Sequence, residues 1–242
     1  MRYPLLDWLR GFAILLMVIY HFCYDLFFFG YLDTAFGKGY WIPFRYVIVI
    51  LFVGLVGVVT YLVHKAELNT RSLWKRTWQL GVACLFVTLS SYFIAPTKMT
   101  LFGILHFILL SSLLAIFFVR IPKIALVFGI SVFVSGHVFS FAELNSVWLH
   151  WIGMVAEKRP ALDYVPMFPW FGIVLIGVFV GYLISTSDAA ANIARVDFDQ
   201  SNNRIFATCS GWLKTAGQHS LIIYLLHQPL MFAGFYLVNW FA

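Results

Sequence analysis

The chain alternates long apolar stretches with short polar ones. Stretches with few or no charged side chains lie at 11–30, 45–63, 78–95, 103–119, 124–141, 168–185 and 220–240. Each holds about 20 residues, which as a helix crosses roughly 30 Å of hydrocarbon. Helices satisfy their backbone hydrogen bonds within lipid, whereas open strands do not. The pattern therefore predicts an all-α fold, a polytopic transmembrane helical bundle with about seven spans, and six or eight spans also fit.

Two further stretches do not fit a span. Residues 144–156 are apolar but too short to cross, and Trp148 and Trp151 suit the aromatic belt at a membrane surface. We expect this stretch to lie along the outer interface or to re-enter the bundle. Residues 185–214 are the most polar part of the chain. We expect an inner loop there.

The overall composition agrees with a membrane protein. Of 242 residues, 62% are hydrophobic and 11% are charged, far from the balance of a soluble domain. The length predicts a single integral-membrane domain over 1–242. The N-terminal MRYPLLDWLR leads into an apolar run without a small-residue cleavage site, so no signal peptide is expected. Cys23, Cys84 and Cys209 show no CxxC spacing, which argues against a disulfide framework or a zinc site.

The basic residues predict the orientation. With the N-terminus inside, the inner segments hold 11 of the 16 basic residues. The outer segments hold the other 5, which are Lys38, Arg45, Lys98, Lys158 and Arg159. Because basic residues gather on the cytoplasmic side, the N-terminus is predicted inside and the C-terminus outside. The same placement of basic residues in the loops explains the net charge of +6. The charge therefore does not indicate nucleic-acid binding, and the expected partner is the lipid bilayer.

The first predicted span carries a polar stripe. Arg10 and His21 are eleven steps apart, which at 100° per residue is about 20° beyond three full turns. The two side chains therefore share a face, roughly 16 Å apart along the helix axis. Asp7 lies on a neighbouring ridge near Arg10, and Asp25 lies one turn beyond His21.

This stripe is the main candidate for chemistry. Ionisable groups within a membrane are costly and normally face the bundle interior or a wet cavity. A carboxylate one turn from an imidazole can orient the ring and raise its basicity. We therefore take His21, Asp25 and Arg10 as candidate catalytic residues, with His21 as a general base. Two structural alternatives stay open: Asp7 and Arg10 as an anchoring ion pair, and His21 as a hydrogen-bonded packing residue.

Other histidines reach a similar predicted depth. His106, His137 and His227 lie in the fourth, fifth and seventh spans, and Gln228 follows His227. Their convergence with His21 is a hypothesis. With Asp7, we take His106, His227 and Gln228 as candidates for binding the acyl donor or the acceptor. Haem or metal binding is the competing use of these histidines, but no spacing such as HExxH is present, so no metal is expected.

Prolines mark the start of the sixth span. Pro166 and Pro169 lie in YVPMFPWFG, at 164–172, where the first turn of a helix tolerates proline. One interpretation is a helix start with interfacial aromatic rings. The other is a rigid rim around an outer cavity, to which Trp170 adds a binding side chain. Small residues continue at near-helical spacing and predict close helix packing: Gly172, Gly177 and Gly181.

Four segments in succession resemble the heparan-alpha-glucosaminide N-acetyltransferase catalytic-domain family, especially its short bacterial members. They are LDWLRGFAILLMVIYHFCYDL at 6–26, GILHFI at 103–108, PMFPWFGIVLIG at 166–177 and GQHSLIIYLLHQPL at 217–230. The resemblance covers almost the whole chain. The spacing of Arg10 and His21 is also similar to the signature of the related acyltransferase-3 family.

The resemblance implies a membrane acyltransferase. Such an enzyme takes an acyl group, typically acetyl, from coenzyme A on the cytoplasmic side and passes it to an acceptor, often a sugar, at the opposite side. It implies acetyl-CoA as the donor, a glycan or small-molecule acceptor, and the bacterial inner (cytoplasmic) membrane as the location. A homodimer is a further candidate assembly.

The resemblance also implies roles for residues. In the acyltransferase-3 motif the histidine matched by His21 is the base, and the arginine matched by Arg10 assists with the acyl donor. In the lysosomal family member the counterpart of His21 is asparagine, and the catalytic histidine comes later. This chain has no histidine between Cys23 and Val63, so His21 with Asp25 takes that role in our hypothesis.

Two other functions use the same residue types. A proton-coupled transporter or flippase of a small polar solute also needs intramembrane Asp, His and Arg. Against it, the sequence shows no inverted repeat and no paired interrupted helices. A haem or quinone subunit would use the histidines. Binding of acetyl-CoA and a visible spectrum would separate these hypotheses.

Overall fold

The structure is a computed structural model that describes residues 3–36, 38–94, 99–157, 163–200 and 203–241. Within these ranges the chain forms helices joined by turns and loops, with isolated bridges but no strand. The predicted all-α class is therefore confirmed. Four basic residues of the charge pattern lie outside the described residues: Arg2, Lys98, Lys158 and Arg159.

The chain divides into two compact units, residues 1–52 with 188–242 and residues 53–187. The first unit contains α1 (Pro4–Phe28), the first half of α2 (Trp41–His64), α7 (Asp188–Ala194), α8 (Arg204–Gln218) and α9 (Ser220–Phe241). The second contains the rest of α2 together with α3 (Thr70–Ile94), α4 (Ile104–Ala115), α5 (Pro122–Val138) and α6 (Met167–Thr186). The expectation of one domain over 1–242 stays a prediction.

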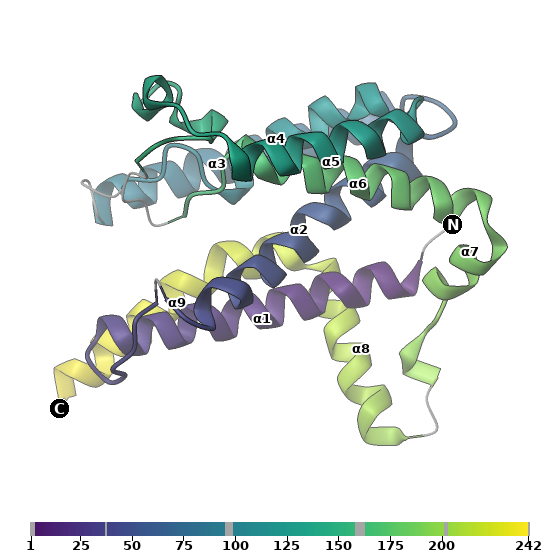
Figure 1. Ribbon diagram of the computed structural model, residues 1–242. Coiled ribbons are helices and arrows are strands. Elements are labelled where there is room, and N and C mark those ends of the chain that lie inside the picture. Colours follow the sequence, from purple (N-terminus) through teal and green to yellow (C-terminus); the bar gives the residue numbers. More distant parts are fainter. Residues whose placement is uncertain (1–2, 37, 95–98, 158–162, 201–202, 242) are drawn as a thin grey trace. The chain divides into compact units, whose positions relative to one another are not determined.

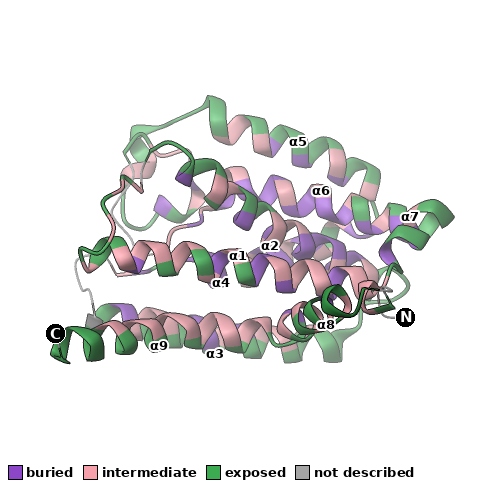
Figure 2. Cartoon of the chain, turned by 90° about the horizontal axis from the view of Figure 1, so that it is seen from below, coloured by how far each residue is buried: buried purple, intermediate pink, exposed green. Residues whose placement is uncertain are grey.

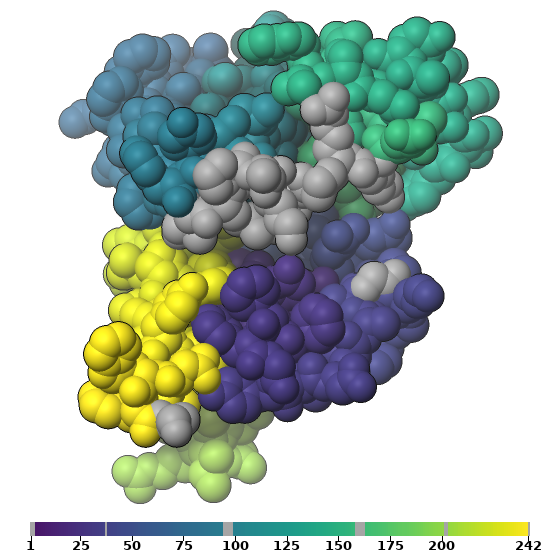
Figure 3. All heavy atoms as spheres, turned by 90° about the vertical axis from the view of Figure 1, so that its left-hand side faces the viewer, coloured from purple at the N-terminus to yellow at the C-terminus, as the bar shows by residue number. Residues whose placement is uncertain are grey.

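In the first unit, α1 and α9 lie side by side and run in the same direction (Figure 1). Phe22 packs on Phe235 with ring centroids 5.8 Å apart. Further along both helices, the Tyr31 hydroxyl donates to Asn239 Oδ1 at 2.7 Å. In the space-filling view, α9 (yellow) lies directly against α1 (purple) (Figure 3). If α1 and α9 are the first and last helices to cross the membrane, their common direction requires an odd number of spans, which agrees with the predicted seven. The inside location of the N-terminus stays a prediction.

In the second unit, helices approach through glycine. A Cβ added to Gly57 would overlap the carbonyl oxygen of Val174, and one added to Gly177 would overlap that of Gly54. Gly172 meets α5 at Gly129 in the same way. These contacts confirm the close packing predicted from the glycine spacing of α6. They also explain why α6 is rich in buried residues (Figure 2).

Each of the seven predicted spans coincides with helix. Among the described residues, four helices are long and apolar enough to cross a membrane: α1, α2, α6 and α9. The apolar helices at Ile104–Phe118, which includes the 3-10 turn η2 (Ile116–Phe118), and Pro122–Val138 are shorter. α3 begins at Thr70, ahead of the predicted 78–95, and its first turns carry three basic residues, Arg71, Lys75 and Arg76. The number of spans therefore stays a prediction.

The prediction of a loop over 185–214 is wrong. This stretch contains α7, the 3-10 turn η5 (Phe198–Gln200) and α8. Ile205, Cys209 and Trp212 recur at helical spacing on α8, a signal hidden by the polar residues between them. Asn203 caps this helix, since its side-chain oxygen accepts from the amides of Ile205 and Phe206, each at 3.1 Å.

The short apolar stretch at 144–156 has no long helix. It overlaps η3 (Ala142–Asn145) and contains η4 (His150–Ile152), both 3-10 helices. Trp148 is 86% exposed, as expected of a residue in an aromatic belt. Its location at the outer interface stays a prediction.

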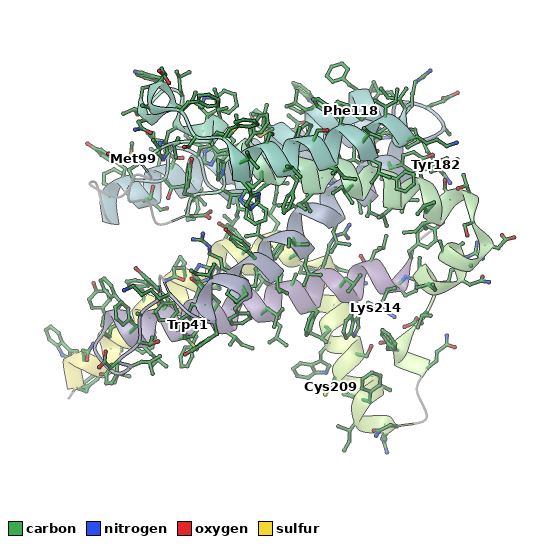
Figure 4. All side chains as sticks on the ribbon, viewed as in Figure 1. Trp41, Met99, Phe118, Tyr182, Cys209 and Lys214 are labelled. Atoms are coloured by element: carbon green, nitrogen blue, oxygen red, sulfur yellow. The ribbon has the colours of Figure 1, made fainter. Side chains whose placement is uncertain are left out.

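Lys214 connects α8 to the preceding segment through side-chain hydrogen bonds. Its Nζ donates to both carboxylate oxygens of Asp197 at 3.1 Å and to Oδ2 of Asp199. Figure 4 labels Lys214 close to the crossing of α8 with α1 and Cys209 nearer the start of α8. The hydrogen bond from Lys214 holds the pKa of Asp199 below its usual value, and the bond to Asp199 raises the pKa of Lys214.

These hydrogen bonds predict that the stability of α8 depends on pH. A carboxyl whose pKa is lowered by folding stabilises the fold above its unfolded pKa of about 4. That contribution is lost as the pH falls through the lowered folded pKa of Asp199. We expect hydrogen-exchange protection factors in α8 to fall between pH 6 and pH 3. Lys214→Met should be less protected at pH 6 and should lose less on acidification; an equal loss in both proteins would contradict the assignment.

Candidate functional site

The polar stripe on α1 begins with an ion pair. Arg10 Nη1 lies 3.0 Å from Asp7 Oδ1, one turn apart on the helix. Asp7 is buried, and the Arg10 side chain is partly exposed. The structural alternative, an ion pair near the helix start, is therefore present. A guanidinium has five N–H donors, so this pair does not exclude an anionic ligand at Arg10.

His21 is oriented by the backbone of its own helix. Its Nδ1 donates to the carbonyl oxygen of Met17, four residues earlier, at 2.9 Å. A neutral imidazole has one N–H, so this bond leaves the lone pair on Nε2. Such a tautomer is the one that a general base needs.

The sequence suggested that Asp25 orients His21, but in the structure it does not. Its Oδ1 instead accepts from Gln228 Nε2 on α9 at 2.8 Å. No hydrogen bond joins Asp25 to His21 among the described residues. The physical reason is that the carbonyl of Met17 already occupies Nδ1 of the ring, whereas the amide of Gln228 reaches the carboxylate from the facing helix.

His227 lies against His21 across the two helices. Their ring centroids are 4.9 Å apart and the rings meet at 70°. His227 Nδ1 donates to the carbonyl oxygen of Tyr224 at 2.6 Å. Of the histidines predicted to converge, the structure brings these two together.

The Asp25–Gln228 pair forms the next rung along α1 and α9. Asp25 is completely buried. Its Oδ2 and Gln228 Oε1 are buried without a hydrogen-bond partner among the described residues. The site thus presents two imidazole rings and, one turn further along α1, two unpaired acceptor oxygens.

Packing one and two turns before His21 on α1 holds this face in position. Ile14 and Met17 form a buried cluster with Ile48 of α2, and Tyr224 of α9 packs against it. Tyr20, next to His21, meets the ring of Trp41 edge to face at 5.8 Å. The residue that orients His21 is therefore itself held in a core.

His106 belongs to the second unit and has both ring nitrogens engaged. Its Nε2 donates to Thr88 Oγ1 at 3.1 Å, since that hydroxyl already donates to the Thr100 carbonyl. Its Nδ1 accepts from the Gly103 amide at 3.4 Å. These bonds join α3 to the start of α4. A structural role explains them, and a role for His106 in binding ligand stays a prediction.

The remaining candidates are placed as follows. Trp170 is buried in α6 of the second unit, and its binding role stays a prediction. His137 is part of α5, where its Nδ1 donates to the Phe133 carbonyl at 2.9 Å. Among the residues that the structure describes, no three His, Cys, Asp or Glu gather into a group that could hold a metal ion.

Sequence reasoning missed three features of the site. The carbonyls of Met17 and Tyr224 orient the histidines, and no residue type signals a backbone contact. The pairing of Asp25 with Gln228 depends on the register of α9 against α1. The i–4 spacing of Met17 from His21 was the one available signal.

Comparison with known proteins gives a family. The family model described as Heparan-alpha-glucosaminide N-acetyltransferase, catalytic, matches residues 2–229, nearly the whole chain. The match contains three of the four resembling segments and all but the last residue of the fourth. No curated protein and no solved structure matches the chain.

Proposed function

The chain belongs to the heparan-alpha-glucosaminide N-acetyltransferase catalytic family, and from this premise we propose that it moves an acetyl group from acetyl-CoA to an amine or hydroxyl acceptor. Family membership implies a transferase, and the four long apolar helices indicate a membrane protein. The observation that carries the proposal is His21, whose Nδ1 is tied to the Met17 carbonyl and whose Nε2 bears the lone pair.

His21 acts as the general base in this mechanism. Its Nε2 removes a proton from the acceptor as the acceptor nitrogen or oxygen bonds to the acetyl carbonyl carbon. The carbon–sulfur bond then breaks, and the coenzyme A thiolate takes the proton from His21. Positioned proton transfer of this kind contributes typically about 10²- to 10⁴-fold to a rate.

His227 supports this step. Its ring packs edge to face on that of His21, which helps to hold the His21 ring in position for proton transfer. A route through an acetyl-histidine on the same nitrogen is the other form of the mechanism. Labelled acetyl-CoA without acceptor separates the two, because only the covalent route leaves label on the protein.

The donor binds at the start of α1 in this proposal. Arg10 is exposed enough to meet an anion, and it lies roughly 16 Å along the axis from His21. That distance lets the phosphates of coenzyme A stay at the cytoplasmic edge while the thioester reaches into the bundle. The acceptor, a glycan or another small molecule, arrives from the opposite face of a bacterial inner membrane.

Arg10 provides a test of donor binding. Arg10→Ala should raise the KM for acetyl-CoA by roughly 10- to 100-fold, because a charge-assisted hydrogen bond to phosphate is lost. The kcat should change less. Arg10→Lys is the matched control. It should retain part of the affinity, since lysine keeps the positive charge but lacks the planar guanidinium that binds a phosphate through two N–H groups. An unchanged KM in Arg10→Ala would exclude this donor site.

Binding of acetyl-CoA to the purified protein tests the function as a whole. Calorimetry in detergent should show binding of acetyl-CoA and weaker binding of dephospho-coenzyme A. No binding, together with uptake of a solute by proteoliposomes, would overturn the proposal in favour of a transporter.

A further inference from the structure

Helix α8 has an exposed apolar face. Ile205 and Trp212 are each 78% exposed, and Cys209 between them is exposed as well. Steps of four and three residues place these side chains within about 60° of one another around the helix. The side of α8 that packs on α1 is a different one, since it contains the buried Gly217 against the Asp7 carbonyl. The packing of α8 on α1 therefore leaves the apolar face exposed, and such patches mark surfaces that bind a partner or a membrane.

The length and direction of α8 suit a helix that lies on a membrane. Its 15 residues extend about 22 Å, less than the roughly 30 Å of hydrocarbon that a spanning helix must cross. Figures 1 and 3 both show α8 extending away from α1 and α9, crosswise to their length. It meets α1 near its first turns, where the Leu213 carbonyl lies against Gly11. With α1 and α9 across the membrane, α8 lies along its surface at the level where α1 enters.

The apolar face of α8 points into the membrane in this arrangement. In Figure 4, Cys209 projects from the side of α8 that faces the C-terminal end of α1. This is the direction in which α1 continues into the bilayer, and the spacing puts Ile205 and Trp212 on the same side. The remaining exposed side is polar and carries Thr208, Thr215 and Gln218. Helices with this division bury their apolar face about 5–10 Å into the boundary between headgroups and acyl chains.

Arg204 adds a positive charge beside the apolar face. Its side chain is exposed, and it forms no ion pair within the part of the chain that the structure describes. A hollow in the surface is lined by Arg204, Ile205, Thr208 and Cys209. A guanidinium binds phosphate oxygens strongly, and the apolar side chains next to it suit the first carbons of an acyl chain. A phospholipid has both parts, and the anionic lipids of a cytoplasmic leaflet attract basic residues.

We propose that α8 is an interfacial helix whose apolar face, formed by Ile205, Cys209 and Trp212, inserts into the inner leaflet while Arg204 contacts the phosphates of anionic phospholipids. The inference does not depend on acetyl transfer. It gives α8 a binding surface for lipid in addition to its packing on α1.

This contact with lipid fixes the depth of α1. Gly217 of α8 touches the Asp7 carbonyl of α1 backbone to backbone, so an α8 held in the interface holds the first turns of α1 there as well. Arg10 lies one turn beyond Asp7 and forms an ion pair with it. The guanidinium of Arg10 is thereby kept at the boundary between water and lipid.

Quenching of a fluorophore on Cys209 tests the insertion. Cys23→Ser and Cys84→Ser leave Cys209 as the single thiol of the full-length protein, which is labelled and placed in nanodiscs of zwitterionic and anionic phospholipid. The matched control carries the label at Gln218→Cys in a Cys209→Ser background, nine residues along and therefore on the opposite side of the helix. Nitroxide on lipid acyl chains should quench the Cys209 label several-fold more than the Gln218 label, and aqueous iodide should do the reverse.

Two results would overturn the insertion. One is equal quenching of both labels by iodide with none by the lipid nitroxide. The other is a Cys209 label that neither quencher reaches in liposomes but that becomes accessible in discs holding one copy, since a second copy of the chain would then cover this face.

Alkylation of the native Cys209 tests the lipid contact of Arg204 and serves also if the cysteine variants do not fold. A charged maleimide reacts with protein in anionic liposomes, and mass spectrometry of the peptide that contains Cys209 gives its rate. Arg204→Gln should raise this rate about fivefold, which corresponds to the roughly 1 kcal/mol that one basic residue contributes at an anionic surface. The two proteins should react at equal rates in zwitterionic liposomes. Equal rates in anionic liposomes would overturn the contact with phosphate, and a rate for wild type as high as for Gln218→Cys would overturn the insertion.

Discussion

Replacement of His21 by alanine is expected to lower acetyl transfer from acetyl-CoA by about 10²- to 10⁴-fold. The reason is that alanine removes the only nitrogen that this mechanism assigns to take the acceptor proton. The side chain is partly exposed, and the hydrogen bond of its Nδ1 goes to the Met17 carbonyl of the same helix. The fold should therefore survive the substitution. Initial rates with saturating acetyl-CoA measure the effect, and circular dichroism checks the helix content.

A second histidine provides the matched control. His219, at the end of α8, is exposed and its Nδ1 donates to the Thr215 carbonyl at 3.0 Å, in the geometry that His21 has with Met17. His219→Ala should keep nearly full activity. If His21→Ala were as active as His219→Ala, the assigned base would be wrong.

Replacement of Gly217 by alanine is expected to have the largest effect on stability. A Cβ at Gly217 would overlap the carbonyl oxygen of Asp7, and Gly11 meets the Leu213 carbonyl just as closely. α8 and α1 thus touch backbone to backbone, and an added methyl group must push them apart. Overpacking of this kind costs typically about 1–3 kcal/mol of unfolding free energy. Activity should fall as well, because Asp7 forms the ion pair with Arg10.

Gly234 on α9 is the control for this substitution. A Cβ there would meet no atom within 4 Å. Gly234→Ala should leave the Tm unchanged or raise it, since alanine favours helix over glycine by about 1 kcal/mol. Thermal unfolding in detergent compares the two variants. Equal Tm values for Gly217→Ala and Gly234→Ala would show that α8 does not pack on α1 in this way.

Much of the fold could be predicted because lipid restricts the choices. Long apolar runs must be helices in a membrane, and each predicted span coincides with helix. Glycine spacing predicted the close approach of α6. The helix α8 was missed because its apolar residues are only part of a polar stretch, so composition concealed the helical period.

The site was predicted less completely. Helical arithmetic placed Asp7, Arg10, His21 and Asp25 on one side of α1, since spacing within a helix is fixed by its geometry. It could not show which residue of α9 faces Asp25, because the register between two helices depends on packing along their whole length. For the same reason it assigned Asp25 to His21, when Gln228 is the closer partner.

Acetyl transfer itself is the most direct test of the central claim. Wild-type protein in proteoliposomes would receive radiolabelled acetyl-CoA on one side and methyl glucosaminide on the other. We predict that labelled N-acetyl product appears on the acceptor side and that its formation depends on His21. Intact acetyl-CoA and unlabelled acceptor, under conditions where the protein is folded and correctly inserted, would contradict the account.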